Sequence, residues 1–166
     1  MYKRQVEGDA AAFELPRRYG LAVATYDMLN HLPSMDTLRG AFASVRQALV
    51  TGGLFVFDLN TARGLAEHWS SIGVEDTEAL FLLNRGIYEP EARRATASIT
   101  GFVRNDTGSY ERFEQVVYNT AFDLAEVSAA LREAGWRDPY AASVADLGTP
   151  LEAPEEARRV FFVARL

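Results

Sequence analysis

Polar residues with the chemistry to bind a ligand lie at the ends of two apolar segments of this sequence. The segment LAVATY ends in Thr25 and Tyr26 and is followed by Asp27, and the segment GLFVFDLN ends in Asn60. Short apolar runs of this kind are typical of buried parallel strands. Because open α/β sheets bind ligands at the carboxyl ends of their strands, we expect these four side chains to face one crevice.

Asp27 and His31 have the most specific chemistry of the polar residues in this region. The Asp27 carboxylate could hold an ammonium group through a charge-assisted hydrogen bond, although a cap on the following turn explains it equally well. Asn30 and His31 come three and four residues later. The imidazole of His31 could act as a general base near neutral pH. The alternative for His31 is a packed, hydrogen-bonded histidine.

The composition excludes several kinds of site. The 166 residues include no cysteine and two histidines, which excludes disulfides, thiolate metal sites and cysteine nucleophiles and gives no basis for a multi-histidine metal site. The net charge of −6 argues against a nucleic-acid-binding or membrane-surface protein. No apolar run approaches the ~20 residues of a transmembrane helix. We therefore expect a cytoplasmic protein of one domain, without a metal.

The order of the apolar segments predicts an α/β fold. Residues 21–26 and 53–60 are expected strands. An apolar stripe at helical spacing lies between them, after the candidate caps Ser34 and Asp36 and before a glycine pair that begins at Gly52. A strand, a helix and a strand with short connections predict a right-handed crossover between parallel strands.

The second half of the chain predicts an inserted sheet and a return to the α/β pattern. Residues 78–122 contain three segments rich in β-branched and aromatic residues, separated by turn signals, which predict an antiparallel sheet of three strands. A helix is expected between the cap Asp123 and the terminal Gly135. Strands are then expected at residues 138–144 and 159–166.

The succession of these segments resembles class I S-adenosylmethionine-dependent methyltransferases. The resemblance is carried by the stretches EGDAAAFELPRRYGLAVATYDMLNHL, RQALVTGGLFVFDLNT, YERFEQ, LREAGW and RRVFFVARL. The chain is similar in particular to the small-molecule subgroup with a β-sheet insertion after the fifth strand, such as glycine and aminosugar N-methyltransferases. The family has the strand order 3-2-1-4-5-7-6, with strand 7 antiparallel.

The resemblance implies a partial Rossmann-like methyltransferase sheet. Family strands 3, 4, 5, 6 and 7 would lie at residues 6–10, 21–26, 53–60, 138–144 and 159–166. Strands 1 and 2, with the glycine-rich turn and the ribose-binding acidic residue, have no counterpart. We therefore interpret residues 6–166 as an amino-terminally truncated methyltransferase domain, inactive by itself, and expect the first dozen residues to lie outside the main sheet. Residues 1–5 match a translated transposon end used in library preparation and are interpreted as a non-native leader.

The resemblance also implies roles for residues on the cofactor side of the site. The Asp9 carboxylate would accept a hydrogen bond from the adenine amino group of S-adenosylmethionine, and the Ala10 N–H would reach a ring nitrogen. A turn-forming aspartate is the alternative for Asp9. Thr25, Tyr26 and Asp27 would complete the cofactor side.

The acceptor side of the site is less well defined by the resemblance. It would be lined by Asn30, by Arg112 on the inserted sheet, and by three residues where the segment 53–60 ends: Asp58, Asn60 and Thr61. A polar strand-to-helix turn explains those three equally well, and an ordinary solvated sheet face is the alternative for Arg112. Val117 and Thr120 stand where the family often has a histidine and an arginine, so no named acceptor is carried over.

The leading hypothesis is methyl transfer from S-adenosylmethionine to a small-molecule acceptor by the parent protein. Such an in-line displacement depends mainly on holding the acceptor close and aligned, so it requires no metal. The alternative is a non-catalytic α/β domain that binds a ligand or a partner through its inserted sheet.

Overall fold

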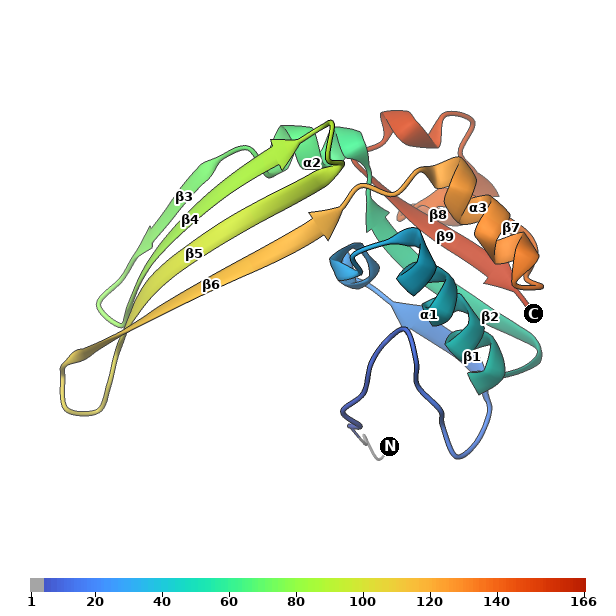
Figure 1. Ribbon diagram of the computed structural model, residues 1–166, viewed down its shortest axis with the longest axis horizontal. Coiled ribbons are helices and arrows are strands. Elements are labelled where there is room, and N and C mark those ends of the chain that lie inside the picture. Colours follow the sequence, from blue (N-terminus) through green and yellow to red (C-terminus); the bar gives the residue numbers. More distant parts are fainter. Residues whose placement is uncertain (1–4) are drawn as a thin grey trace.

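The computed structural model describes residues 5–166, which form a main sheet and a second, inserted sheet (Figure 1). In the main sheet β1 and β2 are parallel, and β9 runs antiparallel to both β2 and β7. Its strands, in spatial order, are β1 (Tyr19–Ala24), β2 (Leu49–Asn60), β9 (Arg159–Arg165), β7 (Arg137–Ser143) and β8 (Asp146–Pro150). The expected α/β fold is confirmed, and the edge strand β8 is an addition to it.

Two helices, α1 (Met35–Ala48) and α3 (Leu124–Glu133), cover one face of the main sheet (Figure 1). α1 begins with a capping box in which Ser34 Oγ accepts from the Thr37 N–H at 3.3 Å and Thr37 Oγ1 accepts from the Ser34 N–H at 3.2 Å. Of the two candidate caps, Ser34 is therefore the one used. Among the described residues no helix has the length and apolar character needed to cross a membrane.

α3 has the two ends that the sequence predicts. Asp123 Oδ1 accepts from the N–H groups of Ala125 and Glu126, which satisfies donors of the first turn. Gly135 has a φ of +86°, and the N–H of Trp136 donates to the Leu131 carbonyl as in a Schellman motif. These ends fix the orientation of α3 on the sheet.

The glycine pair after α1 does not end that helix, so this expectation was wrong. α1 ends at Ala48 and β2 begins at once at Leu49, which places both glycines inside the strand. Gly52 has a φ of +80°, and its N–H donates to the carbonyl of Leu166 at 2.7 Å. The glycine therefore allows an irregular start of β2 beside the end of β9.

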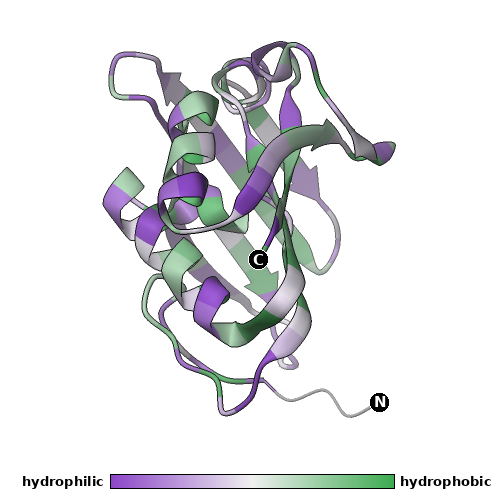
Figure 2. Ribbon diagram, turned by 90° about the vertical axis from the view of Figure 1, so that its right-hand side faces the viewer, coloured by the Kyte–Doolittle hydropathy of each residue, from purple (hydrophilic) through white to green (hydrophobic). Residues whose placement is uncertain are grey.

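The core between helices and sheet is aromatic. The rings of Phe57 and Phe162 stack with centroids 5.1 Å apart, and Phe42 packs against Phe57 at 5.5 Å. Each such fully buried side chain stabilises the fold by about 1.5–3 kcal/mol. In Figure 2 the helices carry both hydrophilic and hydrophobic residues, as expected of helices that cover a sheet.

The inserted sheet has four antiparallel strands, so the expected number of three was wrong (Figure 1). Helix α2 (Ala62–His68) leads into it from β2. The strands are β3 (Ile72–Asp76), β4 (Leu80–Glu89), β5 (Arg94–Arg104) and β6 (Tyr110–Thr120). β3 has only five residues, all exposed, and is held by its main-chain pairing with β4 rather than by a buried face, which is why the sequence pattern does not predict it.

The strand expected at residues 6–10 was wrong, because these residues form no strand in the structure. On the side of β1 away from β2, no strand of the described residues pairs with it, so this segment has no sheet neighbour. It lies outside the main sheet instead, as expected for the first dozen residues. Of the proposed leader at residues 1–5, only Gln5 lies within the described residues.

At Gly64, helix α2 comes close to the main chain of Arg158, the residue just before β9. A Cβ at this position would lie 1.9 Å from the carbonyl oxygen of Arg158. Gly64→Ala should therefore lower the free energy of unfolding by about 1–3 kcal/mol in urea titrations, despite the better helix propensity of alanine. Gly73→Ala is the matched control, because a Cβ there would meet no atom within 4 Å. Equal stability of both variants would contradict the packing described here.

Glu67 on α2 predicts an acid-sensitive contribution to stability. Its hydrogen bond with Arg63, and a second one with Arg158, hold the pKa of Glu67 below its ordinary value of 4.5. The stabilisation is therefore present above the unfolded-state pKa and is lost as pH falls through the lower folded-state pKa. Glu67→Gln should flatten the pH dependence of the melting temperature below about pH 4.5. An equally steep pH dependence in this variant would contradict the contribution of Glu67.

Candidate functional site

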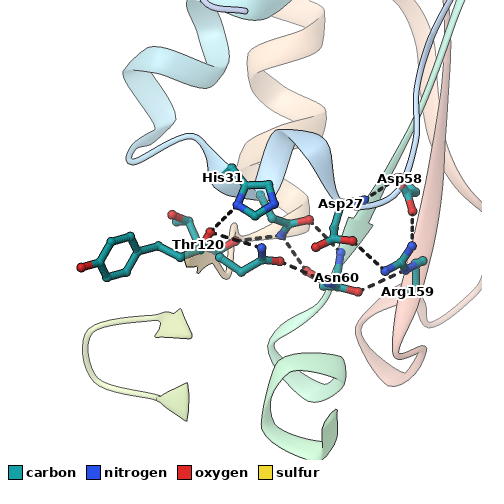
Figure 3. Close-up of polar contacts among 9 residues, drawn as sticks. Asp27, His31, Asp58, Asn60, Thr120 and Arg159 are labelled. Carbon is teal, nitrogen blue, oxygen red and sulfur yellow. Dashed lines mark hydrogen bonds and ion pairs between the residues drawn. The ribbon is translucent and has the colours of Figure 1, made fainter. Parts of the chain in front are cut away.

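The carboxyl ends of β1 and β2 bring together Asp27, Asp58, Asn60 and Arg159, here named the Arg159 cluster (Figure 3). Arg159 is the first residue of the antiparallel strand β9 and pairs with Asn60, so it lies at the same edge of the sheet. Its guanidinium donates to Asp58 Oδ2 at 2.7 Å, to Asp27 Oδ1 at 3.0 Å and to Asn60 Oδ1 at 3.1 Å. One side chain therefore joins the ends of three strands.

The turn after β1 has a strained backbone. Tyr26 and Asp27 have φ values of +64° and +49°, a region that non-glycine residues enter at a cost of about 1–3 kcal/mol each. The Asp27 N–H donates to Asp58 Oδ1 at 3.0 Å, and Arg159 holds the Asp27 carboxylate. The cluster thus stabilises a turn that the local sequence does not favour.

The two carboxylates of the cluster differ in exposure. The side chain of Asp58 is 1% exposed, and each of its oxygens accepts a hydrogen bond, from the Asp27 N–H and from Arg159. The side chain of Asp27 is 17% exposed, and its Oδ2 accepts no hydrogen bond from residues 5–166. With two carboxylates and one guanidinium, the cluster carries a net charge of −1. Asp27 Oδ2 is therefore the carboxylate oxygen of the cluster that has no hydrogen-bond donor within residues 5–166.

Asparagines join the main sheet to the inserted sheet. Asn30, in the short 3-10 helix η1 (Met28–His31), donates to the carbonyls of Asn60 at 3.0 Å and Thr120 at 2.8 Å and accepts from the Asn60 N–H at 2.9 Å. The Asn60 amide donates in turn to Asn119 Oδ1 at 3.1 Å. Because the amide groups of Asn30 and Asn60 bind protein atoms, both fix the positions of the elements around the site.

His31 lies at the edge of this network and is exposed. Its Nδ1 is 2.7 Å from the carbonyl oxygen of Tyr118 (Figure 3). A carbonyl oxygen only accepts hydrogen bonds, so Nδ1 carries the proton and Nε2 has the free lone pair in the neutral ring. The structure thus leaves Nε2 available to accept a proton.

Asp9 and Ala10 lie in the segment that packs on α1. Asp9 Oδ1 accepts from the Ala11 N–H at 2.8 Å, which is the hydrogen bond of a turn-forming aspartate. Ser44 of α1 bonds to this segment, donating to the Ala11 carbonyl and accepting from the Phe13 N–H. No hydrogen bond of Asp9 within the described residues reaches the Arg159 cluster. The adenine-binding role of Asp9 and Ala10 stays a prediction.

The remaining predicted site residues differ in their distance from the cluster. Thr25 and Tyr26 are exposed beside Asp27, with Tyr26 84% exposed. Arg112 forms an ion pair with Glu114 and lies eight residues from Thr120, roughly 27 Å along an extended strand. The structure therefore brings Thr25 and Tyr26 to the site and does not bring Arg112 to it.

Arg159 and Asn119 are the residues of the site that sequence reasoning missed. Asn119 is buried within β6, although the segment around it alternates like a half-exposed strand. Arg159 precedes the apolar run of β9. The signal that could have located it is the antiparallel direction expected for this strand: beside β2, an antiparallel strand begins at the edge where β2 ends, which is the ligand-binding edge. Among residues 5–166, no three or more His, Asp or Glu side chains are grouped as ligands for a metal ion.

Comparisons with known proteins give a curated relative and several similar solved structures. No protein-family model matches the chain. A provisionally named methyltransferase of Geobacillus sp. (strain WCH70) is 27% identical over 143 residues, which cover 84% of this chain and 56% of that protein. The chain thus spans little more than half the length of this curated relative.

Solved structures give the same result. An S-adenosylmethionine-dependent methyltransferase from Clostridium acetobutylicum ATCC 824 matches with a TM-score of 0.80 and 20% identity, over all of this chain and 65% of that one. The sugar N-methyltransferase KedS8 from Streptoalloteichus sp. ATCC 53650 matches with a TM-score of 0.72 and 21% identity, over 95% and 60%. The resemblance to class I S-adenosylmethionine-dependent methyltransferases is confirmed, and the fold of this chain is the one that these enzymes share.

Asn30 gives a test of the polar network. Asn30→Ala would leave the Asn60 N–H and the carbonyls of Asn60 and Thr120 without their side-chain partner. A buried group that loses its partner costs about 1–3 kcal/mol, so unfolding in urea should show a loss of at least about 2 kcal/mol. Asn84→Ala, at an exposed position on β4, is the control. A loss below about 0.5 kcal/mol for Asn30→Ala would contradict the described network.

Proposed function

We propose that the protein to which this domain belongs transfers a methyl group from S-adenosylmethionine to a small-molecule acceptor. The observation that carries this proposal is the Arg159 cluster, with its unpaired Asp27 carboxylate oxygen, at the carboxyl ends of β1 and β2 in a methyltransferase fold. In open α/β sheets this edge is where ligands bind.

The residues present fit a cationic methyl donor. When bound, S-adenosylmethionine supplies an electrophilic methyl group on a sulfonium, and it also carries an ammonium. The net charge of −1 in the Arg159 cluster favours such a cation, and Asp27 Oδ2 offers it a charge-assisted hydrogen bond. Thr25 and Tyr26 would line the same side, and Asp9 with Ala10 would hold the adenine ring.

His31 supplies the other function that such a reaction uses. When the lone pair of an acceptor amine or hydroxyl displaces S-adenosylhomocysteine from the methyl carbon, the acceptor gives up one proton, before, during or after the attack. In the neutral ring the free lone pair of His31 lies on Nε2, so His31 would take this proton as a general base. The rest of the rate enhancement would come from aligning the acceptor with the methyl group. Asn30 and Asn60 support this alignment by fixing η1 and the end of β2.

The acceptor is proposed only by class. KedS8 is a sugar N-methyltransferase, which makes a small amine-bearing molecule a reasonable first probe. Arg112 would reach an acceptor only if that acceptor extended far along β6, because the strand separates Arg112 from Thr120. The inserted sheet would then contribute the acceptor side near Tyr118 and Thr120 rather than near its tip.

Calorimetric titration of S-adenosylhomocysteine into the protein to which this domain belongs tests this function. The protein should bind one equivalent, and Asp27→Asn should weaken binding by about tenfold or more, since it removes a charge-assisted hydrogen bond. Asp106→Asn, in the turn at the far end of the inserted sheet, is the matched control and should bind like the wild-type protein. Absence of binding by the wild-type protein would favour the non-catalytic domain and overturn the proposal.

A further inference from the structure

We propose that Arg159 is a positioning residue that aims the Asp27 carboxylate at a primary ammonium group of the bound ligand. The inference rests on the proposed function and goes beyond it, because it gives a role to a residue of β9 that would touch neither the methyl group nor the acceptor. Three observations carry it: the fork geometry, the strained turn and the distribution of hydrogen bonds between the two carboxylates.

The fork geometry fixes Asp27 from one side. Three different nitrogens of the Arg159 guanidinium donate to Asp27, Asp58 and Asn60 at 2.7–3.1 Å. A guanidinium is planar and rigid, so three simultaneous hydrogen bonds define the orientation of all three acceptors. An ammonium at the same place, as in lysine, would not reproduce this fork.

The strained turn explains why Asp27 needs such a partner. Left-handed φ values at both Tyr26 and Asp27 are sustained only where the surroundings hold them. Three hydrogen bonds hold this turn: the Asp27 N–H donates to Asp58, the Asp27 carbonyl accepts from the Asn30 N–H at 2.9 Å, and the Asp27 carboxylate accepts from Arg159. Without Arg159 the two main-chain hydrogen bonds of Asp27 remain, but no other hydrogen bond within residues 5–166 orients its carboxylate.

The hydrogen bonds leave one acceptor for a ligand. Asp58 is buried and both of its oxygens are used, so its charge serves to hold Arg159. Asp27 Oδ1 is also used, which leaves Asp27 Oδ2 facing outward at the partly exposed end of the cluster. One free carboxylate oxygen in a cluster of net charge −1 matches one ammonium group. The ammonium can belong to the amino-acid part of the cofactor or to an amine of the acceptor.

The test uses two variants that keep the net charge of the cluster and one that changes it. Arg159→Lys keeps a cation but removes the fork. The double variant Asp58→Asn with Arg159→Met removes one charge of each sign, so the buried Asp58 is not left without a partner. Arg159→Met alone makes the cluster more negative, which would strengthen cation binding if charge alone mattered. Arg158→Met, at the exposed neighbouring arginine, is the matched control.

Two pairs of ligands show whether the ammonium that Asp27 contacts belongs to the cofactor or to the acceptor. S-adenosylhomocysteine is compared with 5′-methylthioadenosine, which lacks the amino-acid part. Glucosamine is compared with glucose on protein saturated with S-adenosylhomocysteine. We expect all three Arg159 variants to lose about tenfold or more in affinity for the ammonium-bearing member of one pair, and less than about twofold for the other member. Melting curves confirm that each variant is folded.

The results either assign the ammonium to one ligand or overturn the positioning role of Arg159. A selective loss in the first pair assigns the cofactor ammonium, and a selective loss in the second assigns the acceptor amine. Tighter binding by Arg159→Met, or equal losses for both members of each pair, would overturn the positioning role while leaving the proposed function intact. If the wild-type protein binds no S-adenosylhomocysteine, the proposed function fails and this inference fails with it.

Discussion

The guanidinium of Arg159 is the point at which the ends of β1, β2 and β9 are held together. Parallel strands leave the turns at their carboxyl ends free to diverge, and here the turn after β1 also contains two residues with left-handed backbone. Hydrogen bonds from one rigid donor to Asp27, Asp58 and Asn60 offset that strain. Because Asp58 is buried, neither charge can be removed alone without leaving the other uncompensated.

From this cluster the asparagine network extends the same constraint to the inserted sheet. Asn60 contacts Arg159 on one side and Asn119 of β6 on the other, and Asn30 joins both sheets through main-chain groups. His31 is held in position by a hydrogen bond from its Nδ1 to the carbonyl of Tyr118 on β6. A shift of the inserted sheet would therefore move His31 relative to Asp27. The proposed acid–base group and the proposed cation-binding group are thus coupled through neutral amides whose hydrogen bonds are satisfied within the protein.

The parts that sequence could predict are those fixed by local pattern. The apolar runs that became β1 and β2, the Ser34 cap and the Gly135 terminus each depend on neighbouring residues. β3 could not be predicted, since it has no buried face. The fork of Arg159 could not be predicted either, because its partners lie roughly 100 residues or more away in the chain and meet only in the folded sheet.

A crystal structure of the protein with S-adenosylhomocysteine tests the central claim most directly. The account predicts the ligand along the carboxyl ends of β1 and β2, with Asp27 Oδ2 within about 3.2 Å of an ammonium nitrogen and the Arg159 fork intact. It also predicts His31 Nε2 facing the acceptor side of the ligand. A ligand bound away from this edge, or an Arg159 released from Asp27 in the complex, would contradict the account.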